Sequence, residues 1–242
     1  MHRREMERTA VECLIALESL GFEIEIVSDF SRVANVLSSL ESEIGAAHDH
    51  RRLLLTPGNA FWVFAHRCGR PVAAFGVRMD DLGGENAELF LQRSIEVVFD
   101  VSVTKRRSDI FARATWGRAA YFGGFVSKAA RGLSKEGRYM IQLLTAYVHH
   151  CAFRDLGSDV NYCFLRGADC SRGVPYGFLQ ADPFVWETNR PMYSDGNPEW
   201  VMQLSRERMP SLMTAMAELL RQRFAENQQS LFPVEIKNAA SG

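Results

Sequence analysis

Apolar and polar residues follow two different periods in the first part of the chain. Residues 4–20 place apolar side chains at the spacing of a helix, whereas residues 22–28 alternate apolar and charged side chains as a half-buried strand does. The helical spacing returns in residues 33–40, after Asp29 or Ser31, either of which can cap a helix. The pattern therefore predicts a helix, a strand and a second helix in this order.

Two short runs rich in aromatic and β-branched residues come next. They occupy residues 61–67 and 72–78, and the segment 68–71 between them contains a glycine and a proline, so we expect a β-hairpin. Residues 85–118 follow no single period. Their first half predicts a helix, although residues 97–103 also suit a strand.

The clearest unit lies in the centre of the chain. Residues 118–127 form an apolar run typical of a buried strand, and Gly123 and Gly124 within it would let a second backbone or a ligand approach closely. Residues 137–156 have the period of a long helix, and residues 160–165 indicate another strand. A strand, a helix and a strand in this order form a βαβ unit, whose two strands are normally parallel.

The end of the chain predicts two further strands, at residues 184–187 and 200–204, and a closing helix around residues 212–224 with a frayed terminus after it. No repeat, low-complexity tract or proline-rich linker divides the 242 residues, and 47% of them are hydrophobic, which is ample for one core. We therefore predict a single α/β domain over residues 1–242.

Charge and cysteine content argue against several classes of protein. The chain has 28 basic and 29 acidic residues, a net charge of -1, so no overall field favours nucleic acid or an anionic membrane. No apolar run approaches the roughly 18 residues that span a bilayer. The five cysteines are odd in number and form no C-x-x-C pair, which indicates reduced thiols and a cytoplasmic protein.

The segment between the central strand and the long helix is the best candidate for binding chemistry. A glycine-containing loop that opens a helix presents unpaired backbone N–H groups and the positive end of the helix dipole, which suit phosphate oxygens. Gly132 supplies the glycine, and Arg131 and Arg138 could add charge-assisted hydrogen bonds. The alternative is an ordinary loop with solvated basic residues and a helix cap from Ser134.

Residues from this loop and from the hairpin resemble the GNAT acyltransferases. Val126-x-x-x-x-Arg131-Gly132, followed by a helix, is similar to the family's strand and loop that end in the R-x-x-G-x-G/A pyrophosphate motif. Residues 62–65 and 69–72 are similar to the family's second and third strands and the turn that joins them. The predicted order of elements also matches the order in the family.

The resemblance implies a fold and its boundaries. A central twisted mixed sheet flanked by helices would occupy residues 22–207, after an extra N-terminal helix. Residues 81–118 would be an insertion between the third and fourth strands, and residues 209–226 a C-terminal helix. An insertion at this place could remodel the acceptor site.

The resemblance also implies an activity, the transfer of an acyl group from acetyl-CoA or another, longer acyl-CoA to an amine. The backbone of Phe125 and Val126 would then meet the pantetheine arm and the acyl carbonyl, and the pyrophosphate would lie on the following segment. The residues implied to bind the coenzyme there are Arg131, Gly132, Leu133, Ser134, Gly137 and Arg138. A small molecule or a peptide would supply the amine, and the chain could form a homodimer.

A tyrosine would protonate the departing thiolate of coenzyme A. Tyr176 is the first candidate and Tyr162 the second, and packing in the core is the alternative for both. Glu96 or Asp100 could act as the general base, or each could be an exposed acid of a helix. The His-Asp-His run at 48–50 does not predict a metal site, because residues two apart on a helix do not face one another.

The sequence leaves two other functions open. A GNAT-like domain without activity could sense acyl-CoA or dock a protein partner. An α/β module could instead bind RNA or a protein through the basic segment 105–118, although a solvated basic face is the simpler interpretation. One set of aromatic side chains could line an apolar tunnel for a longer acyl chain or fill the core. They are Phe61, Trp62, Phe64, Phe75, Phe122 and Phe125.

Overall fold

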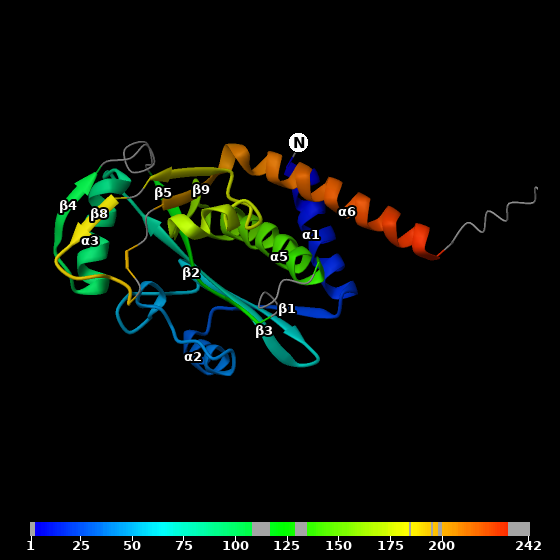
Figure 1. Ribbon diagram of the computed structural model, residues 1–242, viewed down its shortest axis with the longest axis horizontal. Coiled ribbons are helices and arrows are strands. Elements are labelled where there is room, and N and C mark those ends of the chain that lie inside the picture. The colour runs from blue at the N-terminus through cyan, green and yellow to red at the C-terminus, as the bar shows by residue number, and fades with distance from the viewer. Residues whose placement is uncertain are drawn as a thin grey trace, which may run out of the picture.

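In the computed structural model the chain has the mixed α/β fold that the sequence predicts (Figure 1). The residues that the structure describes are 3–107, 117–128, 135–183, 185–194, 196–197 and 200–231. The helices are α1 (Arg3–Ser19), α2 (Phe30–Ser39), α3 (Ala87–Phe99), α5 (Lys135–Cys151) and α6 (Met209–Leu231). The strands of the main sheet are β1 (Phe22–Val27), β2 (Ala60–Arg67), β3 (Arg70–Asp81), β5 (Arg118–Ser127), β6 (Val160–Leu165), β7 (Gln180–Pro183) and β9 (Trp200–Ser205).

The main sheet has seven strands in the order β1-β2-β3-β5-β6-β9-β7. β5 and β6 are parallel, and every other neighbouring pair is antiparallel. The parallel pair belongs to the predicted βαβ unit, in which α5 forms the crossover. The sheet is therefore mixed, and helices flank it, as the resemblance implied.

Local sequence signals set the ends of the early elements. Asp29, rather than Ser31, caps α2, because its carboxylate accepts a hydrogen bond from the backbone N–H of Ser31 at 3.1 Å. The hairpin of β2 and β3 turns at Cys68 and Gly69, which have φ values of 51° and 70°, the backbone of a two-residue hairpin turn. Pro71, which the sequence suggested for the turn, lies inside β3.

The segment between β3 and β5 forms a small unit. α3 begins after Asn86, whose side chain accepts a hydrogen bond from the N–H of Leu89 at 3.0 Å, and ends at Asp100. The strand β4 (Val103–Arg107) follows, so residues 97–99 are helical rather than extended. β4 pairs with β8 (Val185–Thr188) in a separate two-stranded sheet beside α3 (Figure 1).

The late strands differ from the sequence prediction in their pairing. The strand expected at residues 184–187 is present as β8, but it belongs to the small sheet with β4. The edge of the main sheet is formed by β7, which the sequence did not predict and which pairs with β9. Strand pairing depends on contacts between distant residues, so a local period does not reveal it. The terminus predicted to fray, beyond residue 231, lies outside the described residues.

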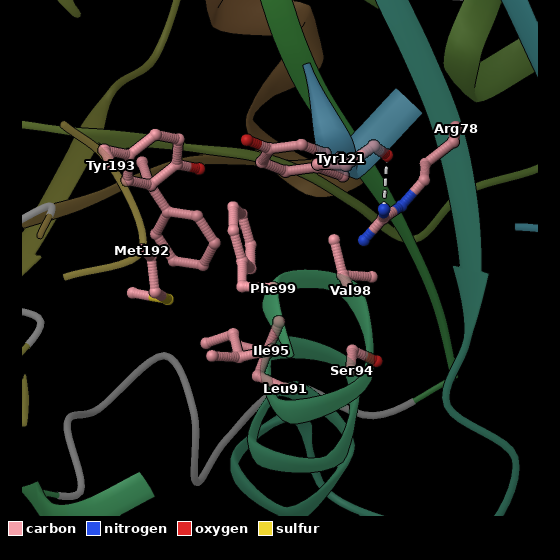
Figure 2. Close-up of a pocket in the computed structure, with 11 residues that line it drawn as sticks. Arg78, Leu91, Ser94, Ile95, Val98, Phe99, Tyr121, Met192 and Tyr193 are labelled. Carbon is pink, nitrogen blue, oxygen red and sulfur yellow. Dashed lines mark hydrogen bonds between the residues drawn. The ribbon is translucent and has the colours of Figure 1, made fainter. Parts of the chain in front are cut away.

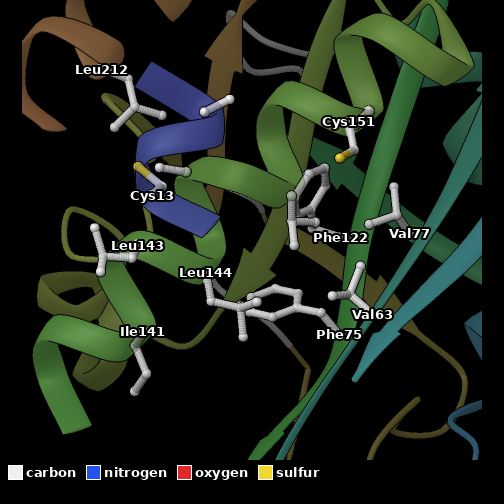
Figure 3. Close-up of a cluster of buried hydrophobic side chains, with 14 of the residues drawn as sticks. Cys13, Val63, Phe75, Val77, Phe122, Ile141, Leu143, Leu144, Cys151 and Leu212 are labelled. Carbon is white, nitrogen blue, oxygen red and sulfur yellow. The ribbon is translucent and has the colours of Figure 1, made fainter. Parts of the chain in front are cut away.

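The two faces of the main sheet have different covers. On one face, α1, α5 and α6 pack over an apolar cluster that includes Phe75, Phe122 and Leu144 (Figures 1 and 3). On the other face, the short helix η1 (Ala46–His48), α2 and α3 cover two smaller clusters. We call these the α5 face and the α3 face. Successive residues of a strand alternate between them, as the pleat of a sheet requires, except at register shifts such as that of β5 at Gly123 and Gly124.

Candidate active site

The two parallel strands at the centre of the sheet pair over a short stretch. Their register joins three residue pairs and ends with Tyr121 opposite Tyr162. β5 then continues to Ser127 and β6 to Leu165, and within these described strands no further pairing joins them, so they diverge. A cavity of about 320 Å³ lies between the diverging ends. We take this central cavity as the candidate active site.

Two glycines of β5 border the central cavity, next to a register shift in the pairing of β5 with β3. Gly124 has a φ of 60°, and a Cβ added to it would lie 2.6 Å from Cη2 of Trp62. A Cβ on Gly123 would lie 2.7 Å from Cε1 of His48. Aromatic side chains therefore make the close approach that the sequence predicted here for a backbone or a ligand, and both glycines also line the cavity.

Aromatic rings form one wall of the cavity, on the α5 face. The ring centre of Phe125 lies 4.5 Å from that of Phe75 and 5.1 Å from that of Tyr176. The ring centres of Phe122 and Phe178 lie 5.8 Å apart. The remaining aromatics considered for an apolar tunnel are buried in the core, and they are Phe61, Trp62 and Phe64. Part of the predicted aromatic set thus lines the cavity and part fills the core.

Tyr176 reaches the cavity from a tight turn that precedes β7. Tyr176 and Phe178 both donate their backbone N–H to the carbonyl of Gly173, at 3.1 and 3.0 Å. The carbonyl of Tyr176 in turn accepts a hydrogen bond from Nε2 of His149 on α5, at 2.9 Å. The turn is therefore held both by its own backbone and by the long helix.

A buried chain of hydrogen bonds orients His149. Ser158 Oγ donates to Asn161 Oδ1 at 2.7 Å, and Asn161 Nδ2 donates to His149 Nδ1 at 3.1 Å. Because Nδ1 accepts, the proton of the neutral ring resides on Nε2, which points to the carbonyl of Tyr176. Burial lowers the pKa of His149 to about 4, so the ring is neutral near pH 7. This network positions the turn that carries Tyr176.

Tyr162, the second predicted tyrosine, lies on the α3 face. Its hydroxyl donates to Asp80 Oδ2 at 2.6 Å, and Asp80 Oδ1 accepts a hydrogen bond from Nε of Arg78 at 2.9 Å. Burial raises the pKa of Tyr162 well above its ordinary value. Tyr162 is thus engaged with a buried ion pair, and it is absent from the described residues that line the cavity with Tyr176.

A third tyrosine, Tyr193, closes the cavity toward the α3 face, and sequence reasoning missed it. Its hydroxyl oxygen accepts a hydrogen bond from the hydroxyl of Tyr121, and Figure 2 shows the two groups facing each other. Burial raises the pKa of both tyrosines. The guanidinium of Arg78 lies over the ring of Tyr121, 5.0 Å from its centre, so a cation borders this pair.

Polar groups that the sequence did not single out also line the cavity. Arg166 follows β6 directly, and Asp169 lies in the short helix η3 (Gly167–Arg172) that comes next. Cys163 contributes its side chain from β6 itself. Ligands of α/β sheets commonly bind beyond the carboxyl ends of parallel strands. The position of Arg166 and Asp169 just after the second parallel strand could therefore have indicated, from the sequence, that they lie at a ligand site.

The residues predicted to bind coenzyme A fall in three places. Phe125 lines the cavity, whereas the side chain of Val126 packs against the cluster beside α2. Gly137 is buried in the first turn of α5, and Arg138 is exposed next to it. The other predicted residues lie outside the described part of the chain, and they are Arg131, Gly132, Leu133 and Ser134. Because α5 follows β5, its N-terminus lies at the end of the sheet where the strands diverge.

The carboxylates considered as general bases are engaged away from the cavity. Glu96 Oε1 accepts a hydrogen bond from the backbone N–H of Val103 at 3.1 Å. Asp100 ends α3 and pairs with Arg190 at 2.7 Å. Among the described residues that line the cavity, Asp169 is the acidic one. Asp169 is therefore the better placed candidate for a base.

The His-Asp-His run at 48–50 is divided between packing and an ion pair. The ring of His48 stacks on that of Tyr121 at 5.3 Å, and the carboxylate of Asp49 binds Arg51 at 2.8 Å. In the described ranges, no group of three or more His, Cys, Asp or Glu side chains is placed to hold a metal ion. None of the helices described here combines the length and the apolar composition that crossing a membrane requires.

No family model and no curated protein sequence matches the chain. Solved structures are similar to it in arrangement. An acyl-CoA N-acyltransferase from Pseudomonas aeruginosa is 14% identical with a TM-score of 0.41, over 76% of this chain and 99% of that one. FeeM, an N-acyl amino acid synthase from uncultured soil microbes, is 12% identical with a TM-score of 0.43, over 79% and 94%. An aminoglycoside acetyltransferase from Legionella pneumophila is 11% identical with a TM-score of 0.39, over 79% and 95%.

Proposed function

We propose that the chain is an N-acyltransferase that moves an acyl group from coenzyme A to an amine. The observation that carries the proposal is the central cavity, which opens where β5 and β6 stop pairing after Tyr121 and Tyr162. Beyond these residues the edge of β5 that faces the cavity has no partner strand among the described residues. Its backbone groups are available to an extended ligand, and the amides of a pantetheine arm can pair with such an edge.

In the proposed reaction the amine nitrogen attacks the carbonyl carbon of the thioester, and the carbon–sulfur bond of the tetrahedral intermediate then breaks. Backbone N–H groups of β5 near Gly124 stabilise the oxyanion, because fixed donors need no reorganisation during the reaction. Tyr176 donates its hydroxyl proton to the departing thiolate, and Asp169 accepts the proton that the amine loses. Both residues line the cavity, which supports these roles.

The pyrophosphate of the coenzyme is proposed to bind where β5 leads into α5. The N-terminus of a helix offers unpaired N–H donors and a partial positive charge, and Gly137 and Arg138 lie in the first turns of α5. Arg131 to Ser134 precede that helix and complete the proposed site. We further propose that residues 1–242 act as one domain, in the cytoplasm, on the amine of a small molecule or peptide.

Binding of coenzyme A is the first test. Calorimetry with coenzyme A, acetyl-CoA and a long-chain acyl-CoA should detect binding, and the thermal midpoint should rise with ligand concentration. Arg131→Glu should weaken all three about tenfold or more, because it replaces a phosphate-binding charge with a repelling one. Arg8→Glu, at an exposed position of α1, is the matched control and should bind normally. Absence of binding by any of these ligands refutes the proposal.

Removal of one hydroxyl tests the chemistry. Tyr176→Phe should lower kcat by about 10²–10⁴-fold, the range expected for loss of a general acid, and leave the affinity for acyl-CoA unchanged. Tyr147→Phe on α5, whose hydroxyl is hydrogen-bonded to Cys151, is the matched control and should retain activity. If the wild-type chain binds acyl-CoA but acylates no amine in a broad screen, it is a domain that senses acyl-CoA.

A further inference from the structure

A groove at the side of α3 leads toward the central cavity. It measures about 300 Å³ and lies between α3, the end of β3 and the segment before β2. Leu54 and Val97 stand at its rim, 87% and 68% exposed, and Phe90 lines its wall. Arg78 and Asp80 also border it, although both are buried. We call this space the α3 groove.

A narrow crevice lies between the α3 groove and the central cavity, and Figure 2 shows the side chains that line it. It contains about 20 Å³ of free space, room for about one water molecule. Each of its ends shares side chains with the neighbouring space. Arg78, Ser94 and Val98 line both the groove and the crevice, and Tyr121, Phe164 and Tyr193 line both the crevice and the cavity. The three spaces are therefore adjacent to one another beside α3, and we call this series of spaces the passage.

This passage approaches the cavity from the α3 face, whereas the coenzyme is proposed to arrive from the start of α5. A bisubstrate reaction needs such a second approach, because the amine must reach the thioester while the coenzyme fills its own side. We propose that the α3 groove binds the acceptor, a primary amine carried on an apolar body, and that the crevice admits its amino group. This inference rests on the proposed acyl transfer and assigns a class of acceptor to it.

The charges around the groove favour an apolar body over a polycation. Nε of Arg78 lies 2.9 Å from Oδ1 of Asp80, and Nη1 of Arg93 lies 2.7 Å from Oε1 of Glu85. Each carboxylate is therefore already paired with an arginine, and Asp80, the acid that lines the groove, offers little to a second cation. The apolar wall instead offers surface that an aliphatic or aromatic body can cover, worth about 25 cal/mol per Å² removed from water.

The crevice also selects the reactive form of the amine. A cation in this narrow space is disfavoured twice, by loss of hydration and by the guanidinium charge of Arg78, which lies 5.0 Å from the ring centre of Tyr121. His48, stacked on the same ring, shows both effects, since burial and then Arg78 lower its pKa to about 3. An amine that reaches Tyr193 is accordingly the uncharged free base, which is the nucleophile.

Calorimetry on the protein saturated with coenzyme A tests the groove, because it measures the affinity for an amine without any turnover. Phenethylamine is the probe, and spermidine is the polycation for comparison. The double variant Leu54→Asn/Val97→Asn removes apolar surface from the rim at positions too exposed to affect folding. It should weaken phenethylamine binding about tenfold, as expected for a few lost methylene contacts. Val11→Asn/Ile15→Asn on α1, at positions 53% and 54% exposed, is the matched control and should bind phenethylamine normally.

A second variant tests the crevice. Ser94→Phe fills it from a half-buried position of α3 and should lower kcat/KM for phenethylamine about 100-fold, because the amino group no longer reaches the thioester. Its affinity for acyl-CoA should equal that of the wild type. Normal kcat/KM in this variant would contradict the crevice as the route of the amine.

Three results overturn the groove itself. They are an absence of phenethylamine binding to the wild type, an unchanged affinity in the rim variant, and tighter binding of spermidine than of phenethylamine. Failure of the proposed acyl transfer is seen separately, as a loss of acyl-CoA binding or as an absence of acylated product in the wild type. Tenfold weaker binding in the rim variant, with normal binding in the α1 variant, supports the inference.

Discussion

The two faces of the main sheet bury different kinds of side chain, and the contrast is sharpest along β3. Phe75 and Val77 enter the apolar cluster beneath α1, α5 and α6. Arg78 and Asp80 point to the α3 face, where the hydroxyl of Tyr162 completes a hydrogen-bonded group. Alternate residues of one strand thus stabilise the fold on one side and border the proposed acceptor passage on the other. The α3 face therefore contains a buried ion pair, whereas the neighbouring residues of β3 on the α5 face pack in an apolar cluster.

The largest expected effect comes from breaking the ion pair of the α3 face. Asp80→Leu should lower the free energy of unfolding by about 3–5 kcal/mol, because Arg78 is left buried without a counter-charge. The double variant Arg78→Met/Asp80→Leu should recover most of this loss, since it leaves no buried charge. Urea unfolding measures both variants. A double variant as unstable as the single one would contradict this account.

A cavity in the α5 face should cost slightly less. Leu144→Ala removes a fully buried side chain from the apolar cluster and should lower the free energy of unfolding by about 3 kcal/mol. Leu54→Ala makes the same chemical change at a residue that is 87% exposed, so it should alter stability by less than about 0.5 kcal/mol. Similar losses in the two variants, measured by thermal unfolding, would show that burial is not what distinguishes them.

Acid should weaken both faces together, and the buried histidines with the lowest pKa values are His149 on the α5 face and His48 on the α3 face. Burial is the main cause that lowers the pKa of His149 to about 4 and that of His48 to about 3. In the unfolded chain each ring has a pKa of about 6.5. Between about pH 6.5 and 5 the unfolded state therefore binds protons that the native state does not bind. The free energy of unfolding should therefore fall by about 1.4 kcal/mol per pH unit for each ring.

The variant His149→Gln separates the two contributions to this pH dependence. It should remove about 1.4 kcal/mol per pH unit from the slope of unfolding free energy and leave the contribution of His48 in place. Denaturant unfolding at several pH values between about 5 and 7 measures the slope. An unchanged slope would mean that His149 is not the neutral hydrogen-bond donor described above.

The smallest effect concerns the start of α3. Asn86→Ala removes the side-chain oxygen that accepts the N–H of Leu89, and should lower the free energy of unfolding by about 1 kcal/mol. Asn86→Asp keeps that acceptor and serves as the control, with stability close to the wild type. Equal losses in both variants would show that the cap is not the source of the effect.

Local spacing explains why much of the fold could be predicted from the sequence. α1, α5 and the β2–β3 hairpin follow from apolar periods and turn residues, which are properties of neighbouring positions. The pairings of β4 with β8 and of β7 with β9 join distant segments and leave no such period. The buried ion pair of Arg78 and Asp80 was not predicted either, because the apolar run in the sequence ended at Arg78 whereas β3 extends to Asp81.

The candidate site could be predicted in part, for similar reasons. The resemblance drew attention to Phe125 and Tyr176, and both lie at the cavity. Tyr162 and Cys163 are adjacent on a strand that is buried on both faces, so the sequence did not show that Cys163 faces the cavity and Tyr162 the ion pair. Tyr193 comes from a segment without any period, and only the fold brings it beside Tyr121.

Because β5 and β6 pair over a short stretch, little strand pairing joins the two halves of the main sheet at its middle. One half contains β1, β2, β3 and β5, and the other half contains β6, β9 and β7. Direct strand pairing between the two halves amounts to three residue pairs. A ligand bound in the cavity would contact both halves and hold them together. Slower amide hydrogen exchange in β6 would report this stiffening. The gap that receives the substrate is also the place where the sheet gains rigidity from it.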